Sequence, residues 1–168
     1  PHSPMQAPDA AIARYAHLSK KSYRRTYAAM VDEMDRAIAA ILDTLDQQGL
    51  ADDTLVLFFS DNGGFEGFGG SNAPLRGQKG QTFEGGIRVP AVLRWPGKIP
   101  AGKTVSAQTT VMDVFPTLAA AASVPVTAEA KFDGRNMWPV LHDGDEGERP
   151  PPLFFASEIP LPGHIHLA

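Results

Sequence analysis

Thr54-Leu55-Val56-Leu57-Phe58-Phe59-Ser60 decides the fold class, because five apolar residues follow one another in it without a polar residue between them. A strand that faces solvent on one side alternates apolar and polar residues, whereas an unbroken apolar run is typical of a strand buried on both faces. Such strands occur in parallel sheets covered by helices. The run therefore predicts a buried strand over residues 54–60.

A long amphipathic helix is predicted before this strand, from about residue 19 to residue 48. Its apolar side chains recur at steps of three and four residues and form one stripe: Tyr23, Tyr27, Met30, Val31, Met34, Ile38, Ile41, Leu42 and Leu45. Gly49 follows where a left-handed C-cap is expected, and Leu50 is placed to fold back on the last turn. A helix, a tight turn and a buried strand make half of a βαβ unit, so the predicted class is α/β.

A polar loop rich in glycine, residues 61–88, follows the strand. A loop of this length inside a compact domain is normally either functional or disordered. The expected elements beyond it are a short strand (89–95), a turn (96–102) and a helix (111–122). We expect Asp113 to cap that last helix and Pro116 to lie in its first turn, where proline is tolerated. The opening residues 1–8 carry three prolines and are expected to be extended.

The composition excludes several classes of function. Fifteen Lys and Arg against nineteen Asp and Glu give the 168-residue chain a net charge of −4, which argues against nucleic acid or an anionic membrane as the main partner. The longest apolar run is too short to span a bilayer. The chain has no cysteine, which excludes disulfides, thiolate metal sites and a cysteine nucleophile within it.

Asp61 and Asn62, directly after the predicted strand, are the first candidate site. Ligands collect at the carboxyl ends of strands in open α/β sheets, and two adjacent side chains with hard oxygen atoms suit Ca²⁺ or Mg²⁺. The alternative is that Asp-Asn-Gly-Gly is a plain turn. Both interpretations stay open on the residues alone.

Two further side chains carry cationic or proton-transfer chemistry. Lys79, held between glycines in the same loop, is placed to present a positive charge to a bound oxyanion, unless it is simply a solvated surface lysine. His2 lies in the proline-rich opening and is able to donate to an oxyanion or protonate a leaving group, unless it is an ordinary terminal histidine. Glu84 and Arg88, four residues apart, are expected to pair and brace the loop.

Several motifs in order resemble the sulfatase family of the arylsulfatase type. They are Ser60-Asp61-Asn62-Gly63, Leu75-Arg76-Gly77-Gln78-Lys79-Gly80 and Glu84-Gly85-Gly86-Ile87-Arg88-Val89-Pro90. Pro1-His2-Ser3-Pro4, Gly49-Leu50-Ala51-Asp52-Asp53-Thr54, Arg94-Trp95-Pro96-Gly97 and Asp113-Val114-Phe115-Pro116-Thr117-Leu118 extend the likeness. The resemblance covers nearly the whole chain and is weakest after Phe155.

The resemblance implies part of an alkaline-phosphatase-like α/β/α sandwich with a mostly parallel sheet, and a sulfuric ester hydrolase as the parent protein. It implies that Asp61 and Asn62 are metal ligands, for Ca²⁺ or alternatively Mg²⁺. It implies that Lys79 contacts the sulfate near its ester oxygen, and that His2 binds the sulfate or assists the leaving alcohol. Both would then be catalytic and substrate-binding residues for a sulfate ester substrate.

The family's formylglycine nucleophile, made from Cys or Ser in a Cys/Ser-x-Pro/Ala-x-Arg motif, has no counterpart here. We therefore expect the chain to be a C-terminal-side fragment of a sulfatase catalytic domain, over residues 1–149. Residues 150–168 would begin a truncated C-terminal subdomain after an exposed linker. The alternatives are a non-catalytic sulfate-ligand-binding pseudoenzyme module and a phosphonate or phosphodiester hydrolase of the same superfamily.

Three further expectations concern the activity, self-association and location of the chain. The fragment alone is expected to be inactive. It is expected to self-associate through the exposed edges of an incomplete sheet. The resemblance implies a periplasmic or secreted parent.

Overall fold

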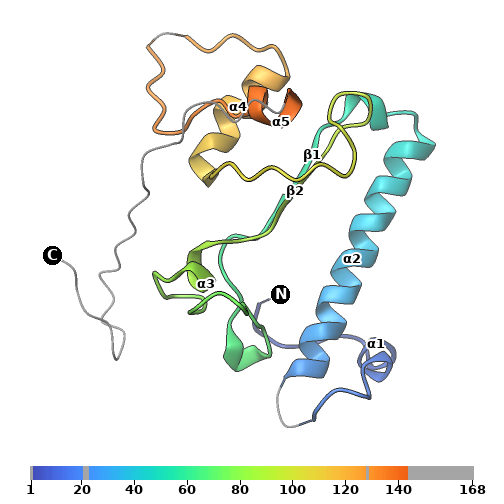
Figure 1. The fold of residues 1–168 in the computed structure, drawn as a ribbon. Helices are drawn as coiled ribbons and strands as arrows, with labels where there is room; N and C mark the ends of the chain where they lie inside the picture. Colours follow the sequence, from blue (N-terminus) through green and yellow to red (C-terminus); the bar gives the residue numbers. More distant parts are fainter. Residues whose placement is uncertain (1, 21–22, 128, 144–168) are drawn as a thin grey trace, which may run out of the picture. The chain divides into compact units, whose positions relative to one another are not determined.

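The computed structural model describes residues 2–20, 23–127 and 129–143, which divide into one compact unit up to Leu93 and a second from Arg94 (Figure 1). The first unit contains helices α1 (Asp9–Arg14) and α2 (Arg24–Gln47), the 3-10 turns η1 (Ala51–Asp53) and η2 (Glu66–Phe68), the short helix α3 (Glu84–Ile87) and strand β1 (Val56–Phe59). Strand β2 (Ala91–Arg94) leads into the second unit, which contains η3 (Val111–Asp113), α4 (Val114–Ala121) and α5 (Trp138–His142).

The long helix predicted before the strand is confirmed as α2, although it begins at Arg24 and not near residue 19. Gly49 has a left-handed φ of 67°, as the C-cap prediction requires. The Gly49 N–H donates to the Asp46 carbonyl at 3.1 Å and the Leu50 N–H donates to the Leu45 carbonyl at 2.9 Å. These two bonds form a Schellman motif, which satisfies carbonyls that the helix end would otherwise leave unpaired.

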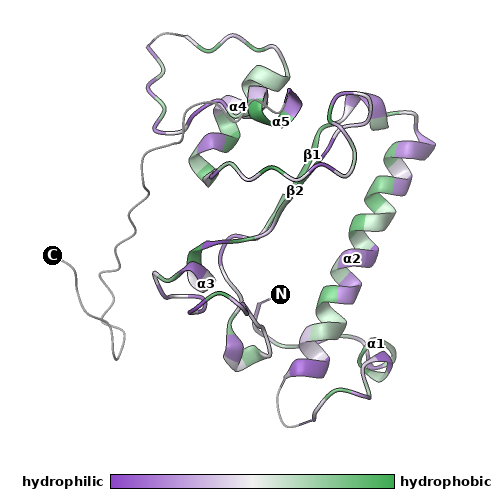
Figure 2. Cartoon of the chain, in the orientation of Figure 1, coloured by the Kyte–Doolittle hydropathy of each residue, from purple (hydrophilic) through white to green (hydrophobic). Residues whose placement is uncertain are grey.

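The apolar stripe of α2 is less covered than the sequence predicts. Hydrophobic and hydrophilic residues alternate along the helix (Figure 2). Of its residues only Ala29 is fully buried, while Ile41 is 60% exposed. The helix packs chiefly against α1 and η1. The described part of the chain therefore leaves much of this stripe without a partner.

Strand β1 confirms the predicted element but not its expected surroundings. Its end lies beside the start of β2, because the Ser60 N–H donates to the Pro90 carbonyl at 3.3 Å, so the two strands run antiparallel. Phe58 and Phe59 are 37% and 38% exposed. The prediction of a strand buried on both faces is wrong for these residues, because the paired strand β2 covers an edge of β1 and neither of its faces. A mostly parallel sheet is not seen among the described residues, whose sheet consists of β1 and β2.

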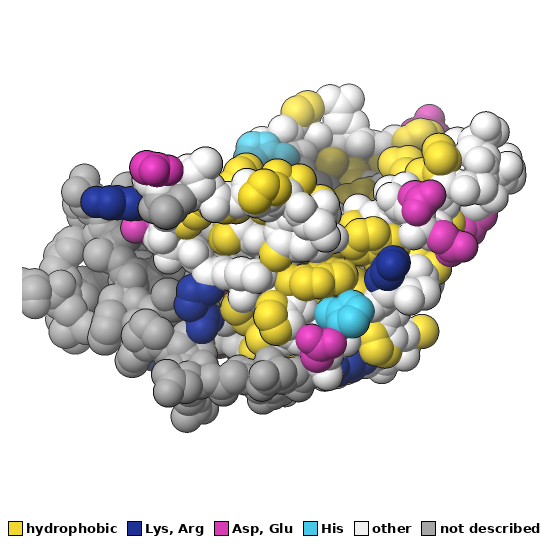
Figure 3. Space-filling view, turned by 90° about the horizontal axis from the view of Figure 1, so that it is seen from above, with side chains coloured by type: hydrophobic (Ala, Val, Ile, Leu, Met, Phe, Trp, Pro, Cys, Tyr) yellow, Lys and Arg dark blue, Asp and Glu magenta, His cyan; other side chains and the backbone are white. Residues whose placement is uncertain are grey.

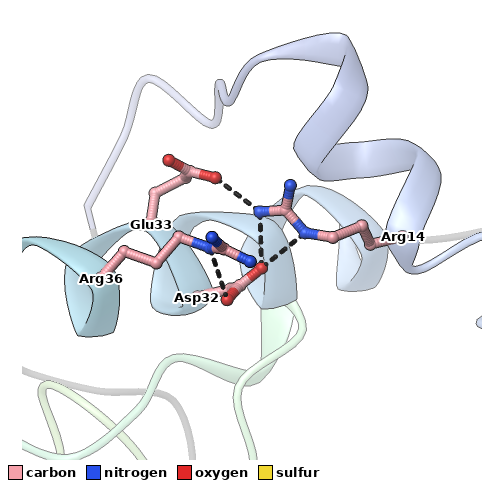
Figure 4. Close-up of polar contacts among 4 residues, drawn as sticks. All are labelled: Arg14, Asp32, Glu33 and Arg36. Atoms are coloured by element: carbon pink, nitrogen blue, oxygen red, sulfur yellow. Dashed lines mark hydrogen bonds and ion pairs between the residues drawn. The ribbon is translucent and has the colours of Figure 1, made fainter. Parts of the chain in front are cut away.

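Helix α1, which the sequence analysis did not predict, is tied to α2 by charged side chains (Figure 4). Arg14 Nε donates to Asp32 Oδ2 at 2.8 Å, and its terminal nitrogen donates to Glu33 Oε1 at 2.5 Å. Arg36 Nε approaches Asp32 Oδ1 at 3.3 Å from the next turn of α2. The hydrogen bond from Arg14 lowers the pKa of Asp32 below its ordinary value, so that carboxylate stays ionised.

The second unit is organised around Asp113, which is 6% exposed. The sequence predicts that this residue caps the following helix. It stands at the N-cap of α4, but its side chain makes no cap bond to α4 and takes part in a capping box with Thr110 at the start of η3. Its carboxylate accepts the Thr110 N–H (2.7 Å) and the Arg135 N–H (2.7 Å). The buried charge is thereby satisfied by two backbone donors and joins residues 22 apart in sequence.

Hydrophobic side chains reach the surface at many positions of the described chain (Figure 3).

Pro116 lies in the first turn of α4, as predicted. The expected linker falls largely outside the described residues, and so does the domain boundary at residues 149 and 150. No helix in the described ranges combines the length and apolar character needed to cross a membrane.

We predict that Asp113→Ala weakens the second unit, because two backbone amides lose a charged acceptor. Local opening at Thr110 and Arg135 should become about 3 kcal/mol easier, from hydrogen bonds to a charged group. Residue-resolved amide exchange measures this change. Asp133→Ala, at an exposed site in the neighbouring segment, is the control and should leave both amides unchanged. Equal protection in the two variants would contradict the prediction.

Candidate active site

The carboxyl end of β1 carries the first two candidate residues, Asp61 and Asn62. Ser60 Oγ donates to the Asn62 carbonyl at 2.8 Å, which holds the backbone in a tight turn. Asn62 Nδ2 donates to the Gly63 carbonyl at 2.9 Å, so the nitrogen end of that amide is engaged. The Asp61 side chain is exposed and the Asn62 side chain is half-buried.

Glycines bring three parts of the loop into backbone contact. The Gly63 N–H donates to the Gly86 carbonyl at 2.9 Å, and the Gly85 N–H donates to the Arg76 carbonyl at 2.7 Å. A Cβ on Gly63 would lie 1.8 Å from the Gly85 carbonyl oxygen. A Cβ on Gly85 would lie 2.3 Å from the Gly77 carbonyl oxygen. Only glycine permits this approach, so the spacing of the loop depends on these positions.

Lys79 lies beside the segment that follows Asp61 and Asn62. Its N–H donates to the Gly64 carbonyl at 3.2 Å, and its side chain is half-buried. The neighbouring Gln78 side chain accepts the Glu66 N–H at 2.8 Å, while the Gln78 N–H donates to the Gln81 side chain at 3.1 Å. The structure therefore brings the backbone of Lys79 against Gly64, two residues after Asn62.

Aromatic side chains anchor the middle of the loop on the start of α2. Phe65 and Phe68 pack edge to face with ring centroids 5.1 Å apart, and Phe68 packs against Tyr23 at 5.8 Å. Gly69, with φ of 90°, lies so close to Arg24 that a Cβ would come within 2.8 Å of its Cα. The loop is thus fixed to the helix as well as to itself.

His2 is exposed, and its ring nitrogen Nδ1 lies 3.0 Å from the carbonyl and 3.2 Å from the hydroxyl of its neighbour Ser3. These contacts are local and do not join the histidine to the glycine-rich loop. The grouping of His2 with Asp61, Asn62 and Lys79 therefore stays a prediction.

The donors at the end of β1 fit a divalent cation in chemistry but not in number. Among the described residues, no group of three or more His, Asp or Glu side chains is gathered closely enough to hold a metal ion. A carboxylate and an amide oxygen are ligands that Ca²⁺ and Mg²⁺ accept, yet Ca²⁺ takes six to eight oxygen atoms. Asp61 and Asn62 would thus supply two ligands of a larger set.

Two pairs of side chains in the loop interact beside the site. Glu84 and Arg88 form the expected pair at 3.6 Å, but both are largely exposed, so the pair adds little stability. The Arg76 guanidinium lies 3.9 Å from the centre of the Phe83 ring, a stacking that the sequence analysis missed.

Asn72 holds the loop together through its side chain, which the sequence did not predict. Its Oδ1 accepts the Gly64 N–H at 2.7 Å, and its Nδ2 donates to the carbonyls of Gly64 (2.8 Å) and Gly77 (3.1 Å). An asparagine inside a glycine-rich loop is a signal for such bonds, since its amide imitates a peptide group.

The motifs on this loop agree with a family comparison. The family model described as Sulfatase matches residues 1–124. The chain belongs to the sulfatase family.

Curated sulfatases are similar to the chain over most of its length. Steryl-sulfatase of Mus musculus is 41% identical over 129 residues, which are 72% of this chain and 21% of that protein. Arylsulfatase H of Homo sapiens is 40% identical over 138 residues, 77% of this chain and 24% of that protein. The chain thus spans about a fifth to a quarter of the length of these curated relatives.

A solved sulfatase-family neighbour shares the backbone arrangement. The crystal structure of Ps i-CgsB in complex with k-i-k-neocarrahexaose matches with a TM-score of 0.79 and 42% identity, over 83% of this chain and 31% of that one. The sulfatase neighbours agree with the α/β, alkaline-phosphatase-like fold class expected from the resemblance.

We predict that Gly63→Ala displaces the loop of this sulfatase, since its Cβ would overlap the Gly85 carbonyl. The cost should be about 3 kcal/mol, the upper part of the range for overpacking. Gly64→Ala is the matched control, because its Cβ would meet Asn72 Oδ1 at 3.3 Å, a tight contact that a shift of a few tenths of an ångström relieves. Urea unfolding of the two variants measures the difference. Equal midpoints would contradict the close approach of Gly63 and Gly85.

Proposed function

We propose that the protein containing this chain hydrolyses sulfate esters, and that residues 61–88 form part of its cation and sulfate site. The observation that carries the proposal is the hydrogen bond from the Lys79 N–H to the Gly64 carbonyl at 3.2 Å. It sets a cationic residue beside the segment that carries Asp61 and Asn62. Membership of the sulfatase family supports the assignment of the reaction.

In this proposal Asp61 and Asn62 hold a divalent cation, Ca²⁺ or alternatively Mg²⁺. A bound cation would withdraw charge from the sulfate oxygens. Lys79 places its ammonium group near the ester oxygen, where negative charge grows as the bond to sulfur breaks. An interaction that strengthens as this charge develops lowers the barrier more than it tightens substrate binding. His2 binds the sulfate or supplies the proton that the leaving alcohol needs.

The nucleophile of this proposal lies outside these 168 residues, because the chain contains no cysteine and no matching serine motif. The family resemblance makes it a formylglycine. A periplasmic or secreted location belongs to the same proposal. Steryl-sulfatase is named for a steryl ester, and the Ps i-CgsB crystal holds a neocarrahexaose. Both an aryl or steryl sulfate and a sulfated saccharide are therefore suitable substrates to test.

We expect the full-length protein to hydrolyse 4-nitrophenyl sulfate and to lose that activity when a chelator removes divalent cations. Lys79→Ala should lower kcat/KM by roughly 10²–10³-fold, the effect of removing a preorganised donor to a developing charge. Release of 4-nitrophenol measures the rate. Lys98→Ala, at an exposed lysine of the second unit, is the matched control and should retain activity.

Asp61→Asn should raise the Ca²⁺ concentration needed for half-maximal activity by at least about tenfold, since even outer partners of a metal have effects of that size. Asp53→Asn, at an exposed aspartate before β1, is its control. Bis(4-nitrophenyl) phosphate and a phosphonate ester test the rival hydrolase. Faster turnover of either phosphorus ester than of the sulfate would overturn the sulfatase assignment.

We further propose that the 168-residue chain made alone is inactive and self-associates. It lacks the nucleophile, and its apolar strand and helix surfaces are exposed, as at Phe58, Phe59 and Ile41. Light scattering should give a mass above the 18.0 kDa of one chain. Turnover of 4-nitrophenyl sulfate by this chain would refute the proposed division of the active site. A monomer at all concentrations would refute the self-association.

A further inference from the structure

Asn72 joins the two parts of the loop that carry the candidate site residues. Gly64, which exchanges two hydrogen bonds with the Asn72 amide, lies two residues after Asn62. Gly77, whose carbonyl accepts from the same Nδ2 at 3.1 Å, lies two residues before Lys79. One planar amide therefore contacts the backbone of both segments at once.

The chemistry of these bonds requires an amide. Oδ1 accepts from the Gly64 N–H at 2.7 Å, while Nδ2 donates to two carbonyl oxygens. A carboxylate of the same shape would keep the acceptor but turn an oxygen atom toward both carbonyls, which removes the Nδ2 donor from each of them and adds repulsion. The Gly64 carbonyl also accepts the Lys79 N–H, so a displacement of Gly64 is transmitted directly to Lys79.

We propose that Asn72 is a positioning residue for the reaction, which sets the distance between the cation ligands Asp61 and Asn62 and the sulfate-binding Lys79. This inference rests on the proposed function for its catalytic consequence. The hydrogen bonds of the Asn72 side chain do not depend on the proposed function. Displacement of a catalytic group by about 1 Å is sufficient to lower a rate by about 10²-fold.

The loop should survive the loss of this amide. Gly63 remains bonded to Gly86, and Gly85 remains bonded to Arg76. The edge-to-face packing of Phe65 and Phe68 is also independent of Asn72. Substitutions at Asn72 are therefore expected to let the segments around Gly64 and Gly77 move relative to each other. They are not expected to unfold the protein.

The test uses Asn72→Asp in the full-length protein, with Asn136→Asp as the matched control. Asn136 is exposed, and its Oδ1 accepts the Trp138 N–H at 2.9 Å, so an aspartate there keeps this bond and adds the same charge. Asn72→Ala is the second variant. It removes the three bonds without introducing a charge, and it serves if the aspartate variant fails to fold.

The first measurement is amide exchange at Gly64 and Lys79, which needs no activity. We expect it to accelerate at least about tenfold at both amides in Asn72→Ala. In Asn72→Asp, whose carboxylate keeps the acceptor for the Gly64 N–H, we expect the same acceleration at Lys79, and in Asn136→Asp the wild-type rate at both. The second is hydrolysis of 4-nitrophenyl sulfate. We expect kcat to fall by about 10²-fold with KM changed by less than about threefold, the pattern of a displaced transition-state contact.

Exchange at both amides within about twofold of wild type would overturn the inference, because the amide would then not hold the two segments together. Faster exchange with a kcat equal to that of Asn136→Asp would overturn it too, since the contact would be structural only. If the wild-type protein hydrolyses no sulfate ester, the proposed function fails by itself. The exchange rates alone then decide whether Asn72 holds the loop.

Discussion

The close approach of glycine backbones in residues 61–88 is the constraint on which the candidate site depends. Gly63 lies against the Gly85 carbonyl and Gly85 against the Gly77 carbonyl, at separations that exclude any side chain. These contacts bring the segment after β1 and the segment around Lys79 together without a sheet or a long helix between them. A loop gains a defined shape in this way only where its backbone groups also find hydrogen-bond partners.

Side-chain amides supply many of those partners. Asn72 satisfies both backbone groups of Gly64 and the carbonyl of Gly77, while the Gln78 side chain accepts the Glu66 N–H. In the second unit the Asp113 carboxylate has a comparable role for Thr110 and Arg135. The irregular segments of this sulfatase chain are therefore held by a few polar side chains that imitate secondary-structure bonding, and each such side chain affects several residues at once.

Local elements were predictable where one short-range cause decides them. The stripe of α2 and the left-handed Gly49 follow from spacing and from the freedom of glycine, and both are confirmed. The burial of β1 was not predictable in the same way. An apolar run specifies a preference for burial, but the neighbours that meet it lie elsewhere in space, and Phe58 and Phe59 remain partly exposed among the described residues. For Asp113, the bond that the sequence did not predict comes from Arg135, 22 residues away, and it adds to the local bond from the Thr110 N–H.

The sequence by itself determined the family, the α/β class, and Asp61, Asn62, Lys79 and His2 as candidates, because those inferences rest on residue types and their order. Only the tertiary structure decided that Lys79 lies beside Gly64 and that Asn72 bridges Gly64 and Gly77. The reason is physical: a glycine-rich loop has many accessible backbone conformations, and long-range hydrogen bonds together with steric exclusion select one of them.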